Sequence, residues 1–133
     1  MLTVDLDTVR LFVHVLAAAV WVGGQLTLGA LLPVLRRAGT DVSRSAARQF
    51  GRLAWSAYAV LLVTGVWNMA AYDDTDRSGF AGTISVKLVM VVLSGIAAVV
   101  HTRATSRTWL AAGGAGALLF ALAAMFLGVV LSG

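Results

Sequence analysis

Cysteine is absent from the 133-residue sequence, which excludes disulfide frameworks, thiolate metal sites and thiol chemistry. Charge is also scarce: charged residues make up 12% of the chain, against about 25% in a typical soluble domain. Proline occurs once, at Pro33 in the last turns of the first predicted helix, where it can kink that helix. These shortages argue against an ordinary soluble protein.

Apolar residues, in contrast, make up 59% of the chain and occur in four long blocks. A bilayer-spanning helix needs roughly 20 mostly apolar residues, and little sequence remains for a soluble domain. The sequence therefore predicts an all-α integral membrane protein, a single domain over residues 1–133 in which four transmembrane helices form an up-down bundle. We expect these helices over about 8–35, 42–72, 83–104 and 108–131.

Polar residues that can cap free backbone amides lie close to the predicted helix starts. Asp7 or Thr8 is expected to cap the first helix, and Thr40 or Asp41 the second. The third helix is expected to start near residues 83–85.

Basic residues are concentrated in the connections between helices 1 and 2 and between helices 3 and 4. They are Arg36, Arg37, Arg44, Arg48, Arg52, Arg103 and Arg107. The positive-inside rule predicts a multi-pass protein of the cell membrane (inner or plasma membrane) with both termini extracytoplasmic. Because topology explains these arginines, the net charge of +4 does not predict a nucleic-acid partner. The lipid bilayer is the predicted partner, and a homodimer is left open.

Ionisable side chains within membrane spans usually face the bundle interior and mark function. Counted at a rise of about 1.5 Å per residue, His14, Lys87 and Asn68 lie at one level in the outer leaflet. Trp21 shares the helix face of His14, so we expect it to line the interior and not to face lipid. These four residues are the predicted cofactor site, with Asn68 or a backbone carbonyl as the partner of the second ring nitrogen of His14.

His14 and Lys87 would each disfavour the charge of the other, and no acid lies in a predicted span to compensate them. A metal ion on neutral His14, or an anionic ligand such as a haem propionate, would relieve that cost. We therefore expect a copper ion or haem b as cofactor. Methionine thioethers are soft ligands that suit Cu(I). The candidate metal ligands are His14, Met69, Met90 and Met125.

The second histidine, His101, does not belong to this predicted site. Helices 1 and 3 run in the same direction, so His101, late in helix 3, lies about 20 Å or more from His14 along the membrane normal. We expect His101 at the inner interface beside Arg103.

Three stretches of the sequence resemble the copper-resistance protein D domain family. "LFVHVLAAAVWVGG" resembles the first-helix signature of that family, "GRLAWSAYAVLLVTGVWN" its second helix and "GTISVKLVMVVLSG" its third. The resemblance covers nearly the whole chain. It implies a four-helix membrane domain that binds or translocates copper, with His14 and Lys87 as the functional polar residues.

The chain is also similar, in the same places, to the four-helix membrane protoporphyrinogen oxidases. Those haem-binding enzymes have a histidine early in the first helix and a lysine in a Val-Lys-Leu context in the third. That resemblance implies a b-type haem protein active in electron transfer or porphyrin oxidation. The sequence favours a copper-handling role that is not enzymatic. The haem protein and a cofactor-free accessory subunit are the alternatives.

Overall fold

A computed structural model describes residues 4–71 and 78–133 of the chain. The described residues are all-helical and contain no strand. The four helices are α1 (Leu6–Ala38), α2 (Thr40–Ala70), α3 (Phe80–Arg103) and α4 (Arg107–Ser132). Each of them is long and apolar enough to cross a membrane.

The start of α1 is fixed by Asp5, and the predicted caps Asp7 and Thr8 are wrong. The Asp5 carboxylate accepts hydrogen bonds from the Thr8 backbone N–H at 2.8 Å and from the Thr8 hydroxyl at 2.6 Å. These two bonds, the hydroxyl first, hold the pKa of Asp5 below its ordinary value. Asp5 has the extended backbone of an N-cap residue, whereas Asp7 lies within the first turn.

A single residue, Gly39, connects α1 to α2. Its φ of +134° is one that residues with a side chain rarely adopt, and its N–H donates to the carbonyl of Arg36. Because Gly39 occupies the cap position, α2 starts at Thr40 without a side-chain cap, and the predicted caps Thr40 and Asp41 are wrong. The turn is therefore tighter than the sequence suggested.

The other two helices also start earlier than predicted. Gly79, with a φ of +85°, precedes α3, which begins at Phe80, one turn before the expected residues 83–85. Ser106 caps α4, because its hydroxyl oxygen accepts a hydrogen bond from the Trp109 N–H.

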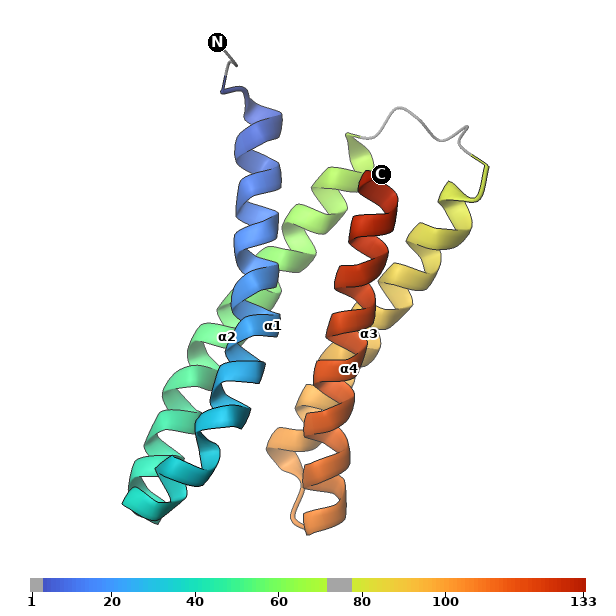
Figure 1. Cartoon of the computed structure of the whole chain (residues 1–133). Coiled ribbons are helices and arrows are strands. Elements are labelled where there is room, and N and C mark those ends of the chain that lie inside the picture. The colour runs from blue at the N-terminus through green and yellow to red at the C-terminus, as the bar shows by residue number, and fades with distance from the viewer. Residues whose placement is uncertain (1–3, 72–77) are drawn as a thin grey trace. The chain divides into compact units, whose positions relative to one another are not determined.

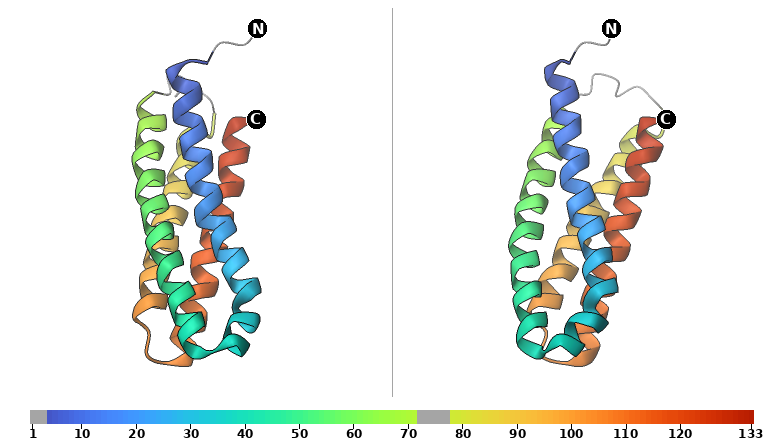
Figure 2. Two further views of the ribbon diagram at one scale, coloured as in Figure 1. Left: turned by 90° about the vertical axis from the view of Figure 1, so that its left-hand side faces the viewer. Right: turned by 60° about the vertical axis from the view of Figure 1, so that its left-hand side comes forward.

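The chain divides into two compact units, Met1–Tyr72 and Asp73–Gly133. The first contains α1 and α2, and the second contains α3 and α4. In each unit the two helices run antiparallel and side by side as a hairpin (Figure 1 and Figure 2). The prediction that all four helices form one bundle stays a prediction.

Small side chains predominate where the two helices of each hairpin meet. The buried residues of the first hairpin are Ala17, Trp21, Val22, Ala54, Ala57 and Thr64. Those of the second are Ser94, Gly95, Gly113, Ala117, Ala121 and Ala124. A methyl group added at Gly113 would stand 2.6 Å from the backbone nitrogen of His101, so the backbones of α3 and α4 approach closely there. Such close helix packing through small residues is typical of membrane helices.

Large apolar side chains lie on the outside of both hairpins. Phe12 is 63% exposed, Val63 67%, Leu119 64% and Phe126 68%. A soluble monomer rarely exposes so much continuous apolar surface. The arrangement of small residues inside and large apolar residues outside suits a surface in contact with lipid.

Candidate functional site

The candidate site is built around His14, on the face of α1 that contacts α2. The ring Nδ1 of His14 lies 2.8 Å from the hydroxyl oxygen of Thr64. Thr64 is buried, with 6% of its surface exposed. The two residues thus join the helices at this level.

The Thr64 hydroxyl determines which ring nitrogen of His14 carries the proton. This hydroxyl lies 2.7 Å from the carbonyl oxygen of Val60, one turn earlier in α2, and donates its single proton there. With that proton committed, the hydroxyl oxygen is left to accept from His14, an arrangement that favours the tautomer with the proton on Nδ1. In the neutral ring, Nε2 therefore carries the lone pair that can bind a metal or haem iron.

A glycine stands next to the imidazole. A methyl group added at Gly65 would lie 3.5 Å from Cε1 of His14, so the ring edge faces bare helix backbone. Met69 follows Gly65 by four residues and therefore lies on the same face of α2, one turn further along. It is 40% exposed. The thioether of Met69 thus belongs to a residue one helical turn from Gly65, which faces the imidazole ring.

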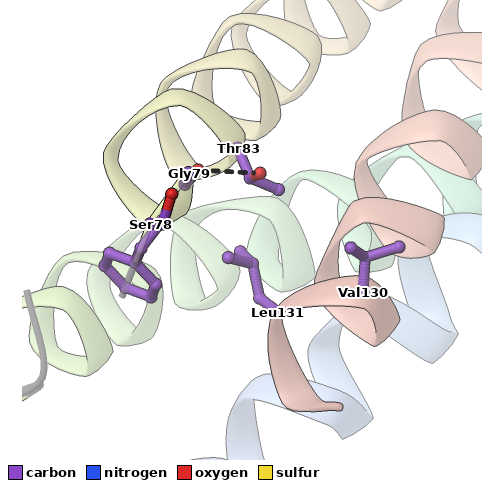
Figure 3. A pocket seen from close by; sticks show the side chains of 6 residues that line it. Ser78, Gly79, Thr83, Val130 and Leu131 are labelled. Carbon is purple, nitrogen blue, oxygen red and sulfur yellow. Dashed lines mark hydrogen bonds between the residues drawn. The ribbon is translucent and has the colours of Figure 1, made fainter. Parts of the chain in front are cut away.

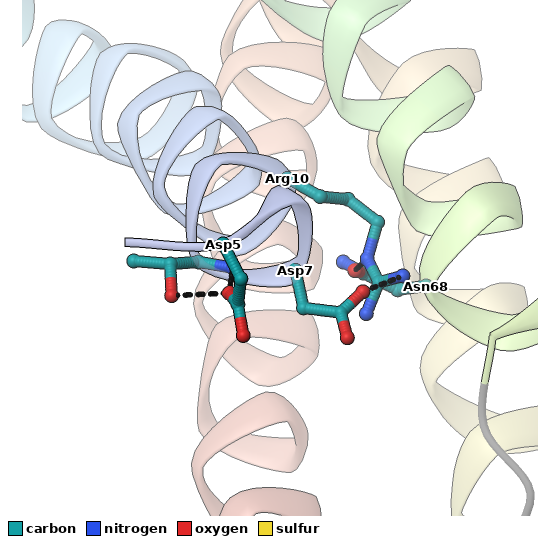
Figure 4. Close-up of polar contacts among 5 residues, drawn as sticks. Asp5, Asp7, Arg10 and Asn68 are labelled. Atoms are coloured by element: carbon teal, nitrogen blue, oxygen red, sulfur yellow. Dashed lines mark hydrogen bonds and ion pairs between the residues drawn. The ribbon is translucent and has the colours of Figure 1, made fainter. Parts of the chain in front are cut away.

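Arg10 lies one turn before His14 and forms a polar cluster at the end of the hairpin away from the Gly39 turn (Figure 4). Its Nε donates to the Asn68 side-chain oxygen at 2.7 Å, and its Nη1 lies 2.8 Å from the Asp7 carboxylate. The guanidinium also lies 6.0 Å from the centre of the Trp67 ring, within the range of a cation–π contact. The charge of Arg10 is thus compensated on several sides.

Asn68 therefore contacts Arg10, and the side chain bonded to Nδ1 of His14 is that of Thr64. The pairs 10–68 and 14–64 both lie symmetrically about Gly39 in the sequence. In an antiparallel hairpin, residues equally far from a tight turn face each other. The sequence prediction missed this pairing because it matched depths counted from the expected helix ends, residues 8 and 72, whereas α1 starts at Leu6 and α2 ends at Ala70.

Trp21 is buried, with 3% of its surface exposed. Its ring packs against Tyr58, with centroids 4.6 Å apart, and against Trp55, with centroids 5.6 Å apart. Trp21 follows His14 by seven residues, about 10 Å along the helix axis. It therefore belongs to an aromatic cluster between α1 and α2 on the turn side of the imidazole.

Lys87 and two of the candidate methionines belong to the second hairpin. The Lys87 amine lies against Gly128 of α4, 3.1 Å from where a Cβ at that glycine would stand. Within residues 4–71 and 78–133 no carboxylate lies within 4.0 Å of this amine. Met90 is half-buried and Met125 is 39% exposed. A site that these residues share with His14 stays a prediction.

A hollow of about 250 Å³ lies in the second hairpin, between the start of α3 and the end of α4 (Figure 3). Its lining residues are Ser78, Gly79, Phe80, Thr83, Val130 and Leu131. No predicted site residue is among them, and none carries an ionisable side chain. Nothing about this hollow indicates a metal or haem site.

The donor types of the candidate ligands limit the metals that would fit. Among the described residues no three His, Cys, Asp or Glu side chains come together as a metal site. Hard cations such as Mg²⁺ or Ca²⁺ need several oxygen ligands, whereas imidazole and thioether suit a soft ion. The residues present fit Cu(I) better than a hard cation.

Comparison with known proteins adds no relative: no protein-family model, curated protein or solved structure matches this chain. The resemblance to the copper-resistance protein D family therefore stays a prediction from the motifs.

Proposed function

We propose that this chain is an integral membrane protein that binds copper through Nε2 of His14. The observation that carries the proposal is the hydrogen bond between His14 and Thr64. Because the Thr64 hydroxyl donates to Val60, this contact favours a proton on Nδ1, and the Nε2 lone pair would then be the metal ligand. Met69, one turn along α2 from Gly65, would supply a thioether. Bound there, copper supplies a soft ion for transfer or a one-electron centre.

The membrane part of the proposal is supported by the surface of the hairpins. Four helices of sufficient length, with large apolar side chains outside and small ones between them, fit a lipid environment. The arginines on the α1–α2 and α3–α4 connections would lie in the cytoplasm, and both termini outside. His14 would then lie in the outer half of the membrane, and a ligand would reach it from outside.

Cysteine labelling in intact cells tests this orientation. With both termini outside, a cysteine that replaces Ser132 is expected to react with an impermeant maleimide. A cysteine that replaces Ser43, beside the Gly39 turn, is expected to react only after lysis. Labelling of the Ser43 variant but not of the Ser132 variant would reverse the orientation.

Haem b is the second candidate, and the position of Arg10 favours it. Arg10 precedes His14 by four residues, so a guanidinium lies on the same helix face as the proposed axial ligand. Arginine binds carboxylates such as haem propionates through two parallel hydrogen bonds, and a propionate here would replace the contacts of Arg10 with Asp7 and Asn68. In this candidate function the protein transfers electrons or oxidises a porphyrin. A cofactor-free accessory subunit is the remaining alternative.

The visible spectrum and the Cu(I) affinity of the purified protein distinguish these functions. The copper proposal predicts no Soret band and one tightly bound Cu(I), measured by competition with a chromophoric chelator. His14→Ala is expected to abolish that binding, and His101→Ala, the matched control, to leave it unchanged. A Soret band in the purified protein would favour haem. A protein that binds neither ligand, or a His14→Ala variant that binds Cu(I) like the parent, would overturn the proposal.

A further inference from the structure

The turn between α1 and α2 carries an unusually dense group of basic residues. Five arginines and one acid, Asp41, lie within residues 36–52 and give this segment a formal charge of +4. We call this segment the basic tip. Its arginines are Arg36, Arg37, Arg44, Arg48 and Arg52.

The arginines of the basic tip are exposed and poorly compensated. All five are exposed. Arg44 lies 3.9 Å from the Asp41 carboxylate, and in the part of the chain that the structure describes no other carboxylate lies within 4.0 Å of a tip arginine. Both side chains of that pair are well exposed, so it neutralises little. Most of the positive charge is therefore available to a ligand.

The fold presents these charges in an ordered row. Arg44, Arg48 and Arg52 recur every four residues, so they form one stripe about 12 Å long on α2. The Gly39 turn brings the end of α1, with Arg36 and Arg37, next to the start of that stripe (Figure 1). The row extends along the helix axis, and so across a range of membrane depths.

Helix length places the basic tip at the level of the lipid headgroups. At about 1.5 Å per residue, the 33 residues of α1 and 31 residues of α2 extend well beyond a hydrocarbon core of about 30 Å. The apolar part of α2 begins at Leu53, so the additional length lies at the turn end. This step rests on the proposed membrane insertion.

Exposed apolar side chains near the arginines favour a lipid over a soluble polyanion. Leu31 is 48% exposed, Val34 59% and Val42 46%, all close to the turn. A phospholipid offers a phosphate for the guanidinium groups and an acyl chain for these side chains. Arginine also matches phosphate geometry through paired hydrogen bonds, which a lysine cannot provide.

We propose that the basic tip binds the phosphate groups of anionic phospholipids, such as phosphatidylglycerol, in the cytoplasmic leaflet. Each arginine near an anionic surface strengthens binding by about fivefold. With several arginines in one row, phosphatidylglycerol is expected to bind at least about tenfold more tightly than phosphatidylcholine.

Native mass spectrometry of the full chain in detergent, titrated with each lipid, tests the proposal. The triple variant Arg44→Gln, Arg48→Gln, Arg52→Gln is expected to bind the two lipids within about twofold of each other. The matched control variant Arg103→Gln, Arg107→Gln is expected to keep the preference, since it alters the other hairpin. Should the triple variant fold poorly by circular dichroism, Arg36→Gln with Arg37→Gln must reduce the preference instead.

Three outcomes would overturn the proposal. They are equal binding of both lipids by the parent protein, an unchanged preference in the folded tip variants, and displacement of phosphatidylglycerol by polyglutamate at equal charge concentration. The last result would assign the basic tip to a soluble acidic partner. Two further measurements separate this proposal from the proposed function. Carbonate extraction of membranes tests insertion alone, and His14→Ala, expected to lose copper, must keep the lipid preference.

Discussion

Replacing Thr64 by valine tests whether the hydroxyl of this residue prepares His14 for ligand binding. Valine has nearly the same shape but cannot accept the hydrogen bond from Nδ1, now 2.8 Å long. Loss of such a supporting partner typically lowers metal affinity by about 10- to 100-fold. This range corresponds to about 1.4 to 2.8 kcal/mol of binding free energy. We expect a loss of Cu(I) affinity in this range.

The effect of Thr64→Val on folding is expected to be smaller than its effect on binding. Hydrogen bonds between membrane helices contribute about 0.6 kcal/mol on average and up to about 1.7 kcal/mol. The second hydrogen bond of Thr64, to Val60, lies within α2, so its loss does not separate the helices. Thermal unfolding of the metal-free protein in detergent measures the loss of folding stability separately from the loss of Cu(I) affinity.

Chelator competition on Thr64→Val and Thr64→Ser gives the decisive comparison. Serine keeps the hydroxyl, so Thr64→Ser is expected to bind Cu(I) within about threefold of the parent. If Thr64→Val binds Cu(I) as tightly as the parent, the hydroxyl does not orient His14. If Thr64→Ser loses as much affinity as Thr64→Val, the loss comes from changed packing, and the argument from the ring proton fails.

Three further perturbations test other parts of the structure. Gly113→Ala places a methyl group 2.6 Å from an α3 backbone nitrogen, so we expect thermal unfolding to show about 1–3 kcal/mol of destabilisation. Gly82→Ala is the control: no atom lies within 4 Å of a methyl group added there, so this variant should keep the stability of the parent. Because the pKa of Asp5 is lowered in the folded state, its cap is fully present above pH 3.8 and is lost as the pH falls through the folded pKa; the protection of the Thr8 amide against hydrogen exchange, taken relative to the intrinsic rate at each pH, should therefore fall only below pH 3.8, and earlier loss would contradict the cap. If Lys87 shares the site of His14, Lys87→Met weakens binding of anionic haem and strengthens binding of Cu(I), whereas unchanged affinity for both would contradict a shared site.

The sequence determined the number and the character of the helices. Helix formation and hydropathy are properties of about 20 consecutive residues, so four apolar blocks were sufficient to predict four helices of membrane-spanning length. The phase of α1 likewise placed Trp21 on the inward face, and its indole is buried between α1 and α2. These features depend only on residues close together in the chain.

The pairing of residues across the first hairpin was decided by tertiary structure. Depths counted from the expected helix ends, residues 8 and 72, made Asn68 the expected partner of His14. In the structure one residue, Gly39, makes the turn, and the register shifts by one helical turn, so Thr64 faces the imidazole and Asn68 faces Arg10. Local patterns predict each helix but not the register between them, because the register depends on the φ of one glycine and on contacts about 50 residues apart.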